Sequence, residues 1–174
     1  MRELILSSLI EEPGVEVGSD EAGKGEDEGP IVVAAVALDE ESRKELRSLG
    51  LLESKSIPKG RVQELFEEIK LRALHLSVRV VTPEEFRSLW VRGNLNFLLA
   101  SWHEEVIRDC LNRVNATKVV VDSFDRKRLE EVLSWVKARL IIEPGADKKY
   151  VSVAAASVVA RHIRELNGGG KKWS

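Results

Sequence analysis

The chain alternates short apolar runs with longer stretches in which apolar residues recur every three or four positions. Runs such as Val119-Val120-Val121 are typical of buried strands. The spacing of Val62, Leu65 and Ile69 is typical of one face of a helix. The predicted strands span about 15–21, 29–38, 75–81, 118–121 and 139–142. The predicted helices span about 39–50, 59–72, 83–90, a long stretch after Asn96, 126–136 and 150–166.

This alternation of strands and helices predicts a three-layer α/β fold. The 174 residues fit one domain with a sizeable core, and no internal repeat or linker divides them. We therefore expect a single domain over residues 1–174. The glycine-rich end, about 168–174, is expected to be a disordered tail.

Charge and cysteine usage narrow the possible functions. Lys and Arg total 27 against 29 Asp and Glu, so the net charge is -2 and no global positive field favours nucleic acid. A polyanionic ligand would instead need local basic residues and metal ions. The one cysteine, Cys110, excludes a disulfide framework and is expected in the core. The three histidines lack the spacing of zinc ligands.

Neither a membrane nor secretion is indicated by the sequence. It contains no run of about 18 apolar residues that would span a bilayer. Its N-terminus, Met-Arg-Glu-Leu-Ile-Leu, has no long apolar segment of the kind found in signal peptides. We expect a cytoplasmic protein with no membrane partner, acting as a monomer.

The most unusual stretch runs from Gly18 to Pro30 and holds five acids, four glycines and one lysine. Asp20 and Glu21 lie at the end of a predicted strand, where neighbours face opposite sides, but a bend at the glycines could bring both to one site. Their oxygens suit Mg²⁺ or Mn²⁺ rather than Zn²⁺. Amides of the glycines can approach a phosphate that Lys24 neutralises. The alternative is a solvated acidic turn.

Two further acids are candidates for the same site. Asp122 directly follows a predicted central strand, where α/β folds gather ligands, although an acid there is also a good turn residue. Ser157, Arg161 and Glu165 share one helical face. Either Arg161 and Glu165 form a surface ion pair, or Glu165 reaches the other acids. Four converging carboxylates would hold two divalent ions for phosphodiester hydrolysis.

Four segments, in order, resemble motifs of the type 2 ribonucleases H, the ribonucleases HII and HIII. They are Gly18–Gly25 with Gly29-Pro30, Glu53-Ser54-Lys55, Val119–Asp122 and Ala146–Arg161. The first and last motifs are close to the family pattern, and together the four span nearly the whole chain. Their combination is far more specific than any single motif.

The resemblance implies a ribonuclease H-like fold, with a five-stranded mixed sheet flanked by helices. It implies cleavage of RNA in RNA–DNA hybrids to 3′-hydroxyl and 5′-phosphate ends, in primer or ribonucleotide removal during replication and repair, with a replication partner not identified. It implies a catalytic, metal-binding set of Asp20, Glu21, Asp122 and Glu165, with Mg²⁺ or Mn²⁺ as a two-ion site. The candidate substrate-binding residues are Gly23, Lys24, Gly25, Lys55, Asn94, Asn96, Lys148, Ser157 and Arg161.

Three departures bear on subtype and substrate. Lys24 stands where ribonuclease HII has arginine, and a glutamate at position 165 is a feature of ribonuclease HIII, whereas HII usually has aspartate there. The tyrosine that HII carries beyond this helix and the N-terminal domain usual in HIII are not found in the sequence. We therefore expect cleavage of continuous RNA, with weak or no cleavage at a single embedded ribonucleotide. The alternatives are a hybrid-binding protein with little turnover and a small-molecule phosphohydrolase.

Overall fold

A computed structural model describes residues 11–24, 29–90 and 94–169, with residues 54–56 described by their backbone alone. The strands are β1 (Val15–Ala22), β2 (Ile31–Leu38), β3 (His75–Val81), β4 (Ala116–Asp122) and β5 (Arg139–Glu143). The helices are α2 (Glu40–Ser48), α3 (Lys59–Arg72), α4 (Pro83–Leu89), α5 (Leu95–Arg113), α6 (Arg126–Val132) and α7 (Val151–Leu166). Two 3₁₀ helices, η1 (Leu51–Ser56) and η2 (Ala146–Lys148), complete the described elements.

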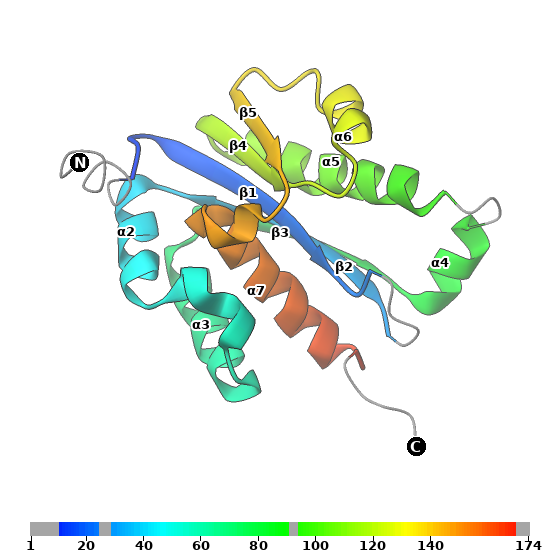
Figure 1. The fold of residues 1–174 in the computed structure, drawn as a ribbon, viewed down its shortest axis with the longest axis horizontal. Helices are drawn as coiled ribbons and strands as arrows, with labels where there is room; N and C mark the ends of the chain where they lie inside the picture. Colours follow the sequence, from blue (N-terminus) through cyan, green and yellow to red (C-terminus); the bar gives the residue numbers. More distant parts are fainter. Residues whose placement is uncertain (1–10, 25–28, 91–93, 170–174) are drawn as a thin grey trace.

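The five strands form one mixed sheet in the order β3-β2-β1-β4-β5 (Figure 1). Strand β1 is antiparallel to β2, which is antiparallel to β3. On its other side β1 runs parallel to β4, and β4 runs parallel to β5. The predicted five-stranded mixed sheet is therefore confirmed, and every predicted strand is present.

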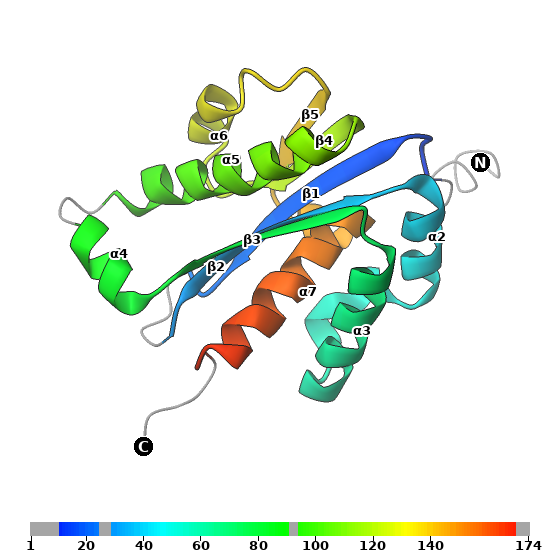
Figure 2. The same cartoon turned by 180° about the vertical axis from the view of Figure 1, so that it is seen from behind.

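Helices cover both faces of this sheet, as the two opposite views show (Figures 1 and 2). All eight residues of β2 are buried, because alternate side chains enter different cores. Val33 and Ala35 pack with residues of α5. Val32 and Ala34 pack with residues of α3 and α7 on the other face. This double burial explains the unbroken apolar sequence of β2.

Three predicted boundaries differ from the structure. Helix α6 ends at Val132 instead of 136, because the chain turns at Leu133 while Leu133 still faces the core. The predicted loop at 52–58 contains η1. The disordered tail expected from 168 does not include Gly169, which is buried and whose amide donates to the Arg164 carbonyl at 2.9 Å. Residues 170–174 lie outside the described residues.

Helix α7 lies directly against β1, and Gly18 permits this approach. A Cβ atom at Gly18 would lie 2.2 Å from the Ser152 carbonyl carbon and 2.4 Å from the Val153 nitrogen. Both are backbone atoms, so no side-chain rotation could relieve the clash.

In the described part of the chain, no helix is long and apolar enough to cross a membrane.

We predict that Gly18→Ala lowers the free energy of unfolding by about 3 kcal/mol or more, because it separates β1 from α7. Gly60→Ala is the matched control, since a Cβ at this position in α3 meets nothing within 4 Å. That change should leave stability unchanged or raise it by up to about 1 kcal/mol. Urea unfolding of both variants measures the difference. Equal stability of the two variants would show that the close contact at Gly18 is not needed.

Candidate active site

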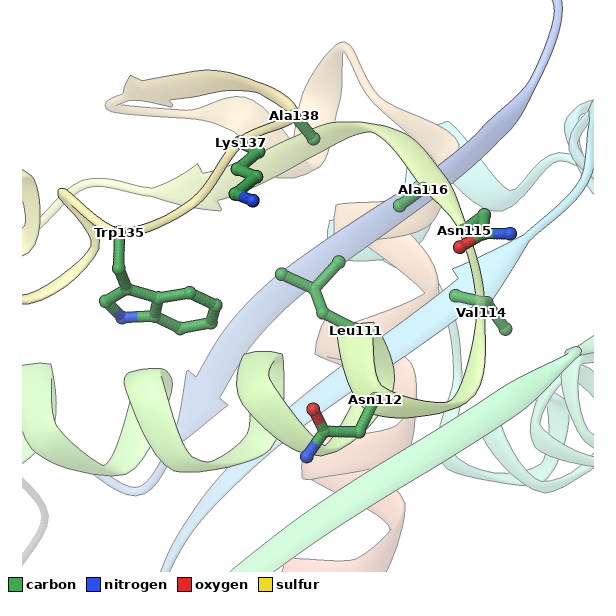
Figure 3. Close-up of a pocket in the computed structure, with 8 residues that line it drawn as sticks. All are labelled: Leu111, Asn112, Val114, Asn115, Ala116, Trp135, Lys137 and Ala138. Carbon is green, nitrogen blue, oxygen red and sulfur yellow. The ribbon is translucent and has the colours of Figure 1, made fainter.

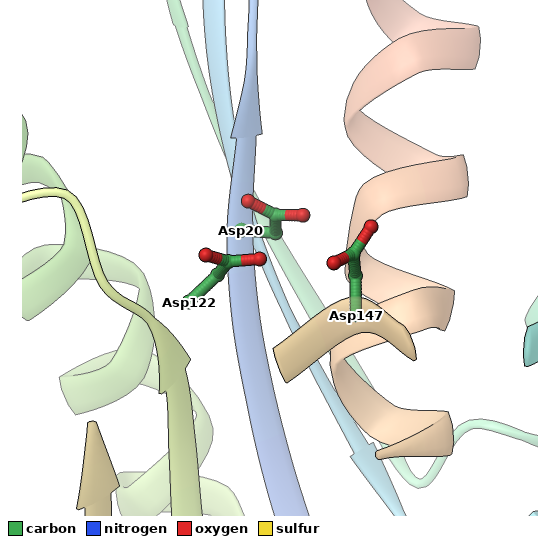
Figure 4. A group of neighbouring side chains, drawn as sticks. All are labelled: Asp20, Asp122 and Asp147. Atoms are coloured by element: carbon green, nitrogen blue, oxygen red, sulfur yellow. The ribbon is translucent and has the colours of Figure 1, made fainter. Parts of the chain in front are cut away.

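Three aspartates from distant parts of the sequence meet at the carboxyl ends of the central strands β1 and β4. Carboxylate oxygens of Asp20, Asp122 and Asp147 all lie within 4.8 Å of one another. Figure 4 shows the three side chains pointing toward a common centre from β1, the end of β4 and η2. Oxygen donors at such spacing suit a hard divalent cation such as Mg²⁺ or Mn²⁺.

The backbone explains why these three residues converge. Ser19 of β1 pairs with Val121 of β4 in the parallel register, so the next residues, Asp20 and Asp122, lie side by side. After β5 the chain turns at Gly145, whose positive φ of 70° suits glycine, and enters η2. This turn brings Asp147 to the N-terminal end of α7, beside the two strand residues.

The electrostatics of the group reflect burial and like charge. Asp20 is only 8% exposed, and burial, followed by the charges of Glu21 and Asp122, raises its pKa well above the ordinary value. Burial and the neighbouring Asp147 raise the pKa of Asp122 to about 6. A divalent cation among these carboxylates would remove this mutual repulsion, so the residues present fit a metal ion.

Glu21 faces the opposite side of β1 from Asp20, as expected for neighbours in a strand. Its Oε2 atom lies 2.8 Å from Nε2 of His103 in α5, and its amide donates to Asp20 Oδ1 at 2.8 Å. Burial opposes ionisation of Glu21, but the hydrogen bond and charge of His103, aided by Lys24, lower its pKa below the ordinary value. Glu21 is thus an ionised neighbour of the three aspartates without being one of the group.

The structure does not bring Glu165 to this site. Its carboxylate pairs with Arg161 Nε at 3.5 Å, so the surface ion pair left open by the sequence is what the structure contains. Glu165 lies near the C-terminal end of α7, about 20 Å along the helix axis from Val151. Asp147, on the turn before α7, is the third member of the group, and Glu165 is not a member of it. The HIII-like acid set expected from the sequence depended on Glu165, which lies outside this group.

The predicted substrate-binding residues are spread over several elements. Gly23 has a φ of +95°, and a Cβ there would lie 2.5 Å from both the Pro30 carbonyl and Arg164 Nε. Lys24 is exposed, with its amine 4.8 Å from the centre of the Phe124 ring. Lys148 directly follows Asp147 in η2, Asn94 and Asn96 begin α5, and Ser157 and Arg161 lie on α7. Gly25 and the side chain of Lys55 lie outside the described residues.

Sequence reasoning missed two residues that the structure connects to the site, Asp147 and His103. Asp147 lay in a quoted motif, where Gly145 before it could have indicated a tight turn. His103 gave no local signal, because its partners Ser19 and Glu21 are more than 80 positions away. Cys110, by contrast, is buried as expected, and burial raises the pKa of its thiol to about 12, so it is unreactive.

A cavity of about 500 Å³ lies at the opposite end of β4 from Asp122 (Figure 3). Its lining includes Leu111 of α5, Ala116 at the start of β4, and Trp135 and Lys137 before β5. Among the residues that the structure describes, no carboxylate contributes to this lining. The cavity is therefore separate from the aspartate group.

Comparison of the sequence with known proteins identifies the family of this chain. The ribonuclease HII family model matches residues 17–168. The chain belongs to the ribonuclease HII family. Ribonuclease HII of Archaeoglobus fulgidus is 37% identical over 154 residues, which cover 87% of this chain and 72% of that protein. The family assignment confirms the resemblance of the motifs and the ribonuclease H enzyme activity, endonucleolytic cleavage of RNA in RNA–DNA hybrids.

Two solved structures are similar over most of the chain. The PCNA:RNase HII complex from A. fulgidus matches with a TM-score of 0.78 and 35% identity, covering 87% of this chain and 72% of that one. Bst-RNase HIII in complex with Mn²⁺ also matches with a TM-score of 0.78, at 26% identity, covering 88% of this chain and 52% of that one. These similarities confirm the ribonuclease H-like fold, and the family is metal-dependent.

The raised pKa of Asp122 predicts how pH affects the metal-free protein. A folded pKa of about 6 exceeds the ordinary value of 3.8, so this carboxyl binds protons more tightly in the folded state. Its contribution to stability is present below about pH 4 and is lost as the pH rises through about 6. Asp122→Asn should therefore raise the free energy of unfolding at pH 8 in chelator by about 1–2 kcal/mol, after allowance for partial exposure, and should have little effect at pH 4.

Asp109→Asn is the control, because the hydrogen bond from His75 lowers the pKa of that carboxyl. The same substitution at Asp109 should leave stability at pH 8 unchanged or lower it. Thermal unfolding at both pH values makes the comparison. If Asp122→Asn lowers stability at pH 8, the carboxylates are not under mutual repulsion.

Proposed function

We propose that Asp20, Glu21, Asp122 and Asp147 bind divalent ions, Mg²⁺ or Mn²⁺ as a two-ion site, and that the RNA strand is cleaved there. The observation that carries this proposal is the convergence of three carboxylates within 4.8 Å at the ends of β1 and β4. The match of the ribonuclease HII model across this region supports it.

The chemistry of the donors agrees with this function. All four are carboxylates, which are hard ligands, and none is a thiolate or imidazole. When bound, divalent ions at this site would stabilise the charge developing on the scissile phosphate and lower the pKa of the attacking water. Asp20, Asp122 and Asp147 would hold these ions from three different elements, β1, β4 and η2. Glu21 would complete the site with the carboxylate oxygen that does not bond to His103.

Other residues would hold and orient the substrate. The left-handed turn at Gly23 suits glycine, and the missing Cβ leaves room for Arg164 and the Pro30 carbonyl, which pack against the start of this loop. Backbone amides of the loop would then contact a phosphate or ribose. Lys24 and Lys148, both exposed, would neutralise backbone phosphates of the hybrid. Asn94, Asn96, Ser157 and Arg161 remain candidates for further polar contacts. Cleavage would leave 3′-hydroxyl and 5′-phosphate ends.

We also propose that the reaction takes place during DNA replication and repair. The A. fulgidus relative has been solved in complex with PCNA, which supports a role for this chain beside a replication protein. Removal of RNA primers or ribonucleotides from DNA would be that role. Residues 1–174 would form one catalytic domain that acts as a monomer on the hybrid duplex.

The assignment of the fourth acid gives the sharpest test of the site. Asp147→Asn should lower the rate of hybrid cleavage at saturating Mg²⁺ by about 100-fold or more, because it removes a ligand charge while keeping the side-chain shape. Glu165→Gln is the matched control and should retain close to full activity, since it affects only an ion pair with Arg161. Cleavage of a labelled RNA–DNA hybrid measures both rates.

If instead Asp147→Asn is active and Glu165→Gln is inactive, Glu165 is the fourth metal-binding acid, as assigned from the sequence. A wild-type protein that binds hybrids without cleaving them in Mg²⁺ or Mn²⁺ would favour the hybrid-binding alternative. Hydrolysis of small phosphate esters in place of hybrids would favour the phosphohydrolase alternative.

Lys24 underlies the prediction on substrate choice. A lysine neutralises a phosphate as a point charge and cannot brace a loop with a bidentate fork as arginine does. We predict faster cleavage of a continuous RNA strand in a hybrid than of a duplex with one embedded ribonucleotide, where a single 2′-hydroxyl must be recognised. The test is to measure the cleavage rates of both substrates in parallel, for the wild-type protein and for Lys24→Ala. Lys127→Ala is the control variant, because Lys127 is also exposed. Equal or faster cleavage at the single ribonucleotide would contradict the prediction.

A further inference from the structure

His103 is a fully buried polar residue of α5 that contacts β1 at two points. Its Nδ1 atom lies 2.6 Å from Oγ of Ser19, and its Nε2 atom lies 2.8 Å from Oε2 of Glu21. Its exposed fraction is 0%. Ser19 and Glu21 are two positions apart on the same strand, so both side chains point toward α5. One imidazole thus spans both of them.

The direction of these hydrogen bonds follows from the partners. A carboxylate oxygen only accepts, so Nε2 of His103 must donate to Glu21. The Ser19 hydroxyl can either donate to Nδ1 or accept from it, so this bond holds the ring in either case. Phe124 packs against the imidazole, with ring centres 5.5 Å apart, and limits its movement. The ring is therefore fixed on both edges and on one face.

This arrangement fixes how Glu21 can bind a ligand. The imidazole bonds to Oε2 and so holds the carboxylate in one orientation, while Oε1 makes no bond to His103. Without the imidazole, the long glutamate side chain would have more rotamers open to it, and ordering it would oppose metal binding. Partners of this kind, which hold a metal-binding side chain in place, commonly change metal affinity by about 10–100-fold when removed.

We propose that His103 is a positioning residue for the metal centre, which presents Glu21 to the divalent ion in one orientation and is itself held by Ser19. The proposal rests on the proposed role of Glu21 as a metal ligand. It assigns a function to a residue of α5, a helix that supplies none of the three aspartates.

Two amide variants separate positioning from simple packing. His103→Gln can keep an N–H donor near the Nε2 position, facing Glu21, while His103→Asn keeps one near Nδ1, facing Ser19. We expect Mn²⁺ affinity, measured by calorimetry without substrate, to stay close to wild type for His103→Gln. It should fall about 10-fold for His103→Asn. The Mn²⁺ concentration that half-saturates hybrid cleavage should change in parallel.

His162→Gln is the control, since this second buried histidine packs against Phe66 away from Glu21 and should not change Mn²⁺ affinity. Equal affinities for His103→Gln and His103→Asn would overturn the proposal. If His103→Asn does not fold, Ser19→Ala replaces it, and an unchanged Mn²⁺ affinity in that variant would overturn the proposal. Failure of the proposed function is recognised separately, because wild-type protein would then bind no Mn²⁺ and cleave no hybrid.

Discussion

Repulsion between buried carboxylates is the constraint on which this site depends. Asp20, Asp122 and Asp147 have oxygens within 4.8 Å of one another, and burial and like charge raise the pKa values of Asp20 and Asp122. Such a group is unfavourable in itself, so the rest of the fold must hold it in place. The same repulsion makes the group selective for a divalent cation, whose charge offsets that of several carboxylates.

The acids are held rigidly because they lie on or beside the central strands of the sheet and the helix packed against them. Strands β1 and β4 are neighbours in the middle of the sheet, and α7 approaches β1 closely enough that only glycine fits at Gly18. Near its other end α7 places Arg164 against Gly23, where its Nε donates to the Pro30 carbonyl at 2.9 Å. The helix therefore connects the turn carrying Asp147 with the glycine loop that leaves β1.

Much of this arrangement could be predicted from the sequence, and the reasons for the failures are physical. Asp20 was identified because adjacent acids enter a glycine-rich loop, and Asp122 because it directly follows an apolar strand. Both signals are local properties of the sequence. Glu165 was chosen for its helical spacing, which defines a face of α7 but not what that face meets. Asp147 lies on a turn, where no periodicity applies. His103 depends on contacts between α5 and β1 that only the folded chain creates.

The most direct test of this account is the position of bound metal. Anomalous diffraction from crystals grown with Mn²⁺ locates each ion without reference to activity. We expect density among Asp20, Asp122 and Asp147, with one carboxylate oxygen of Glu21 directed at it and the other still bonded to His103. Mn²⁺ bound at Glu165 instead, or no ion at the three aspartates at millimolar Mn²⁺, would contradict the account.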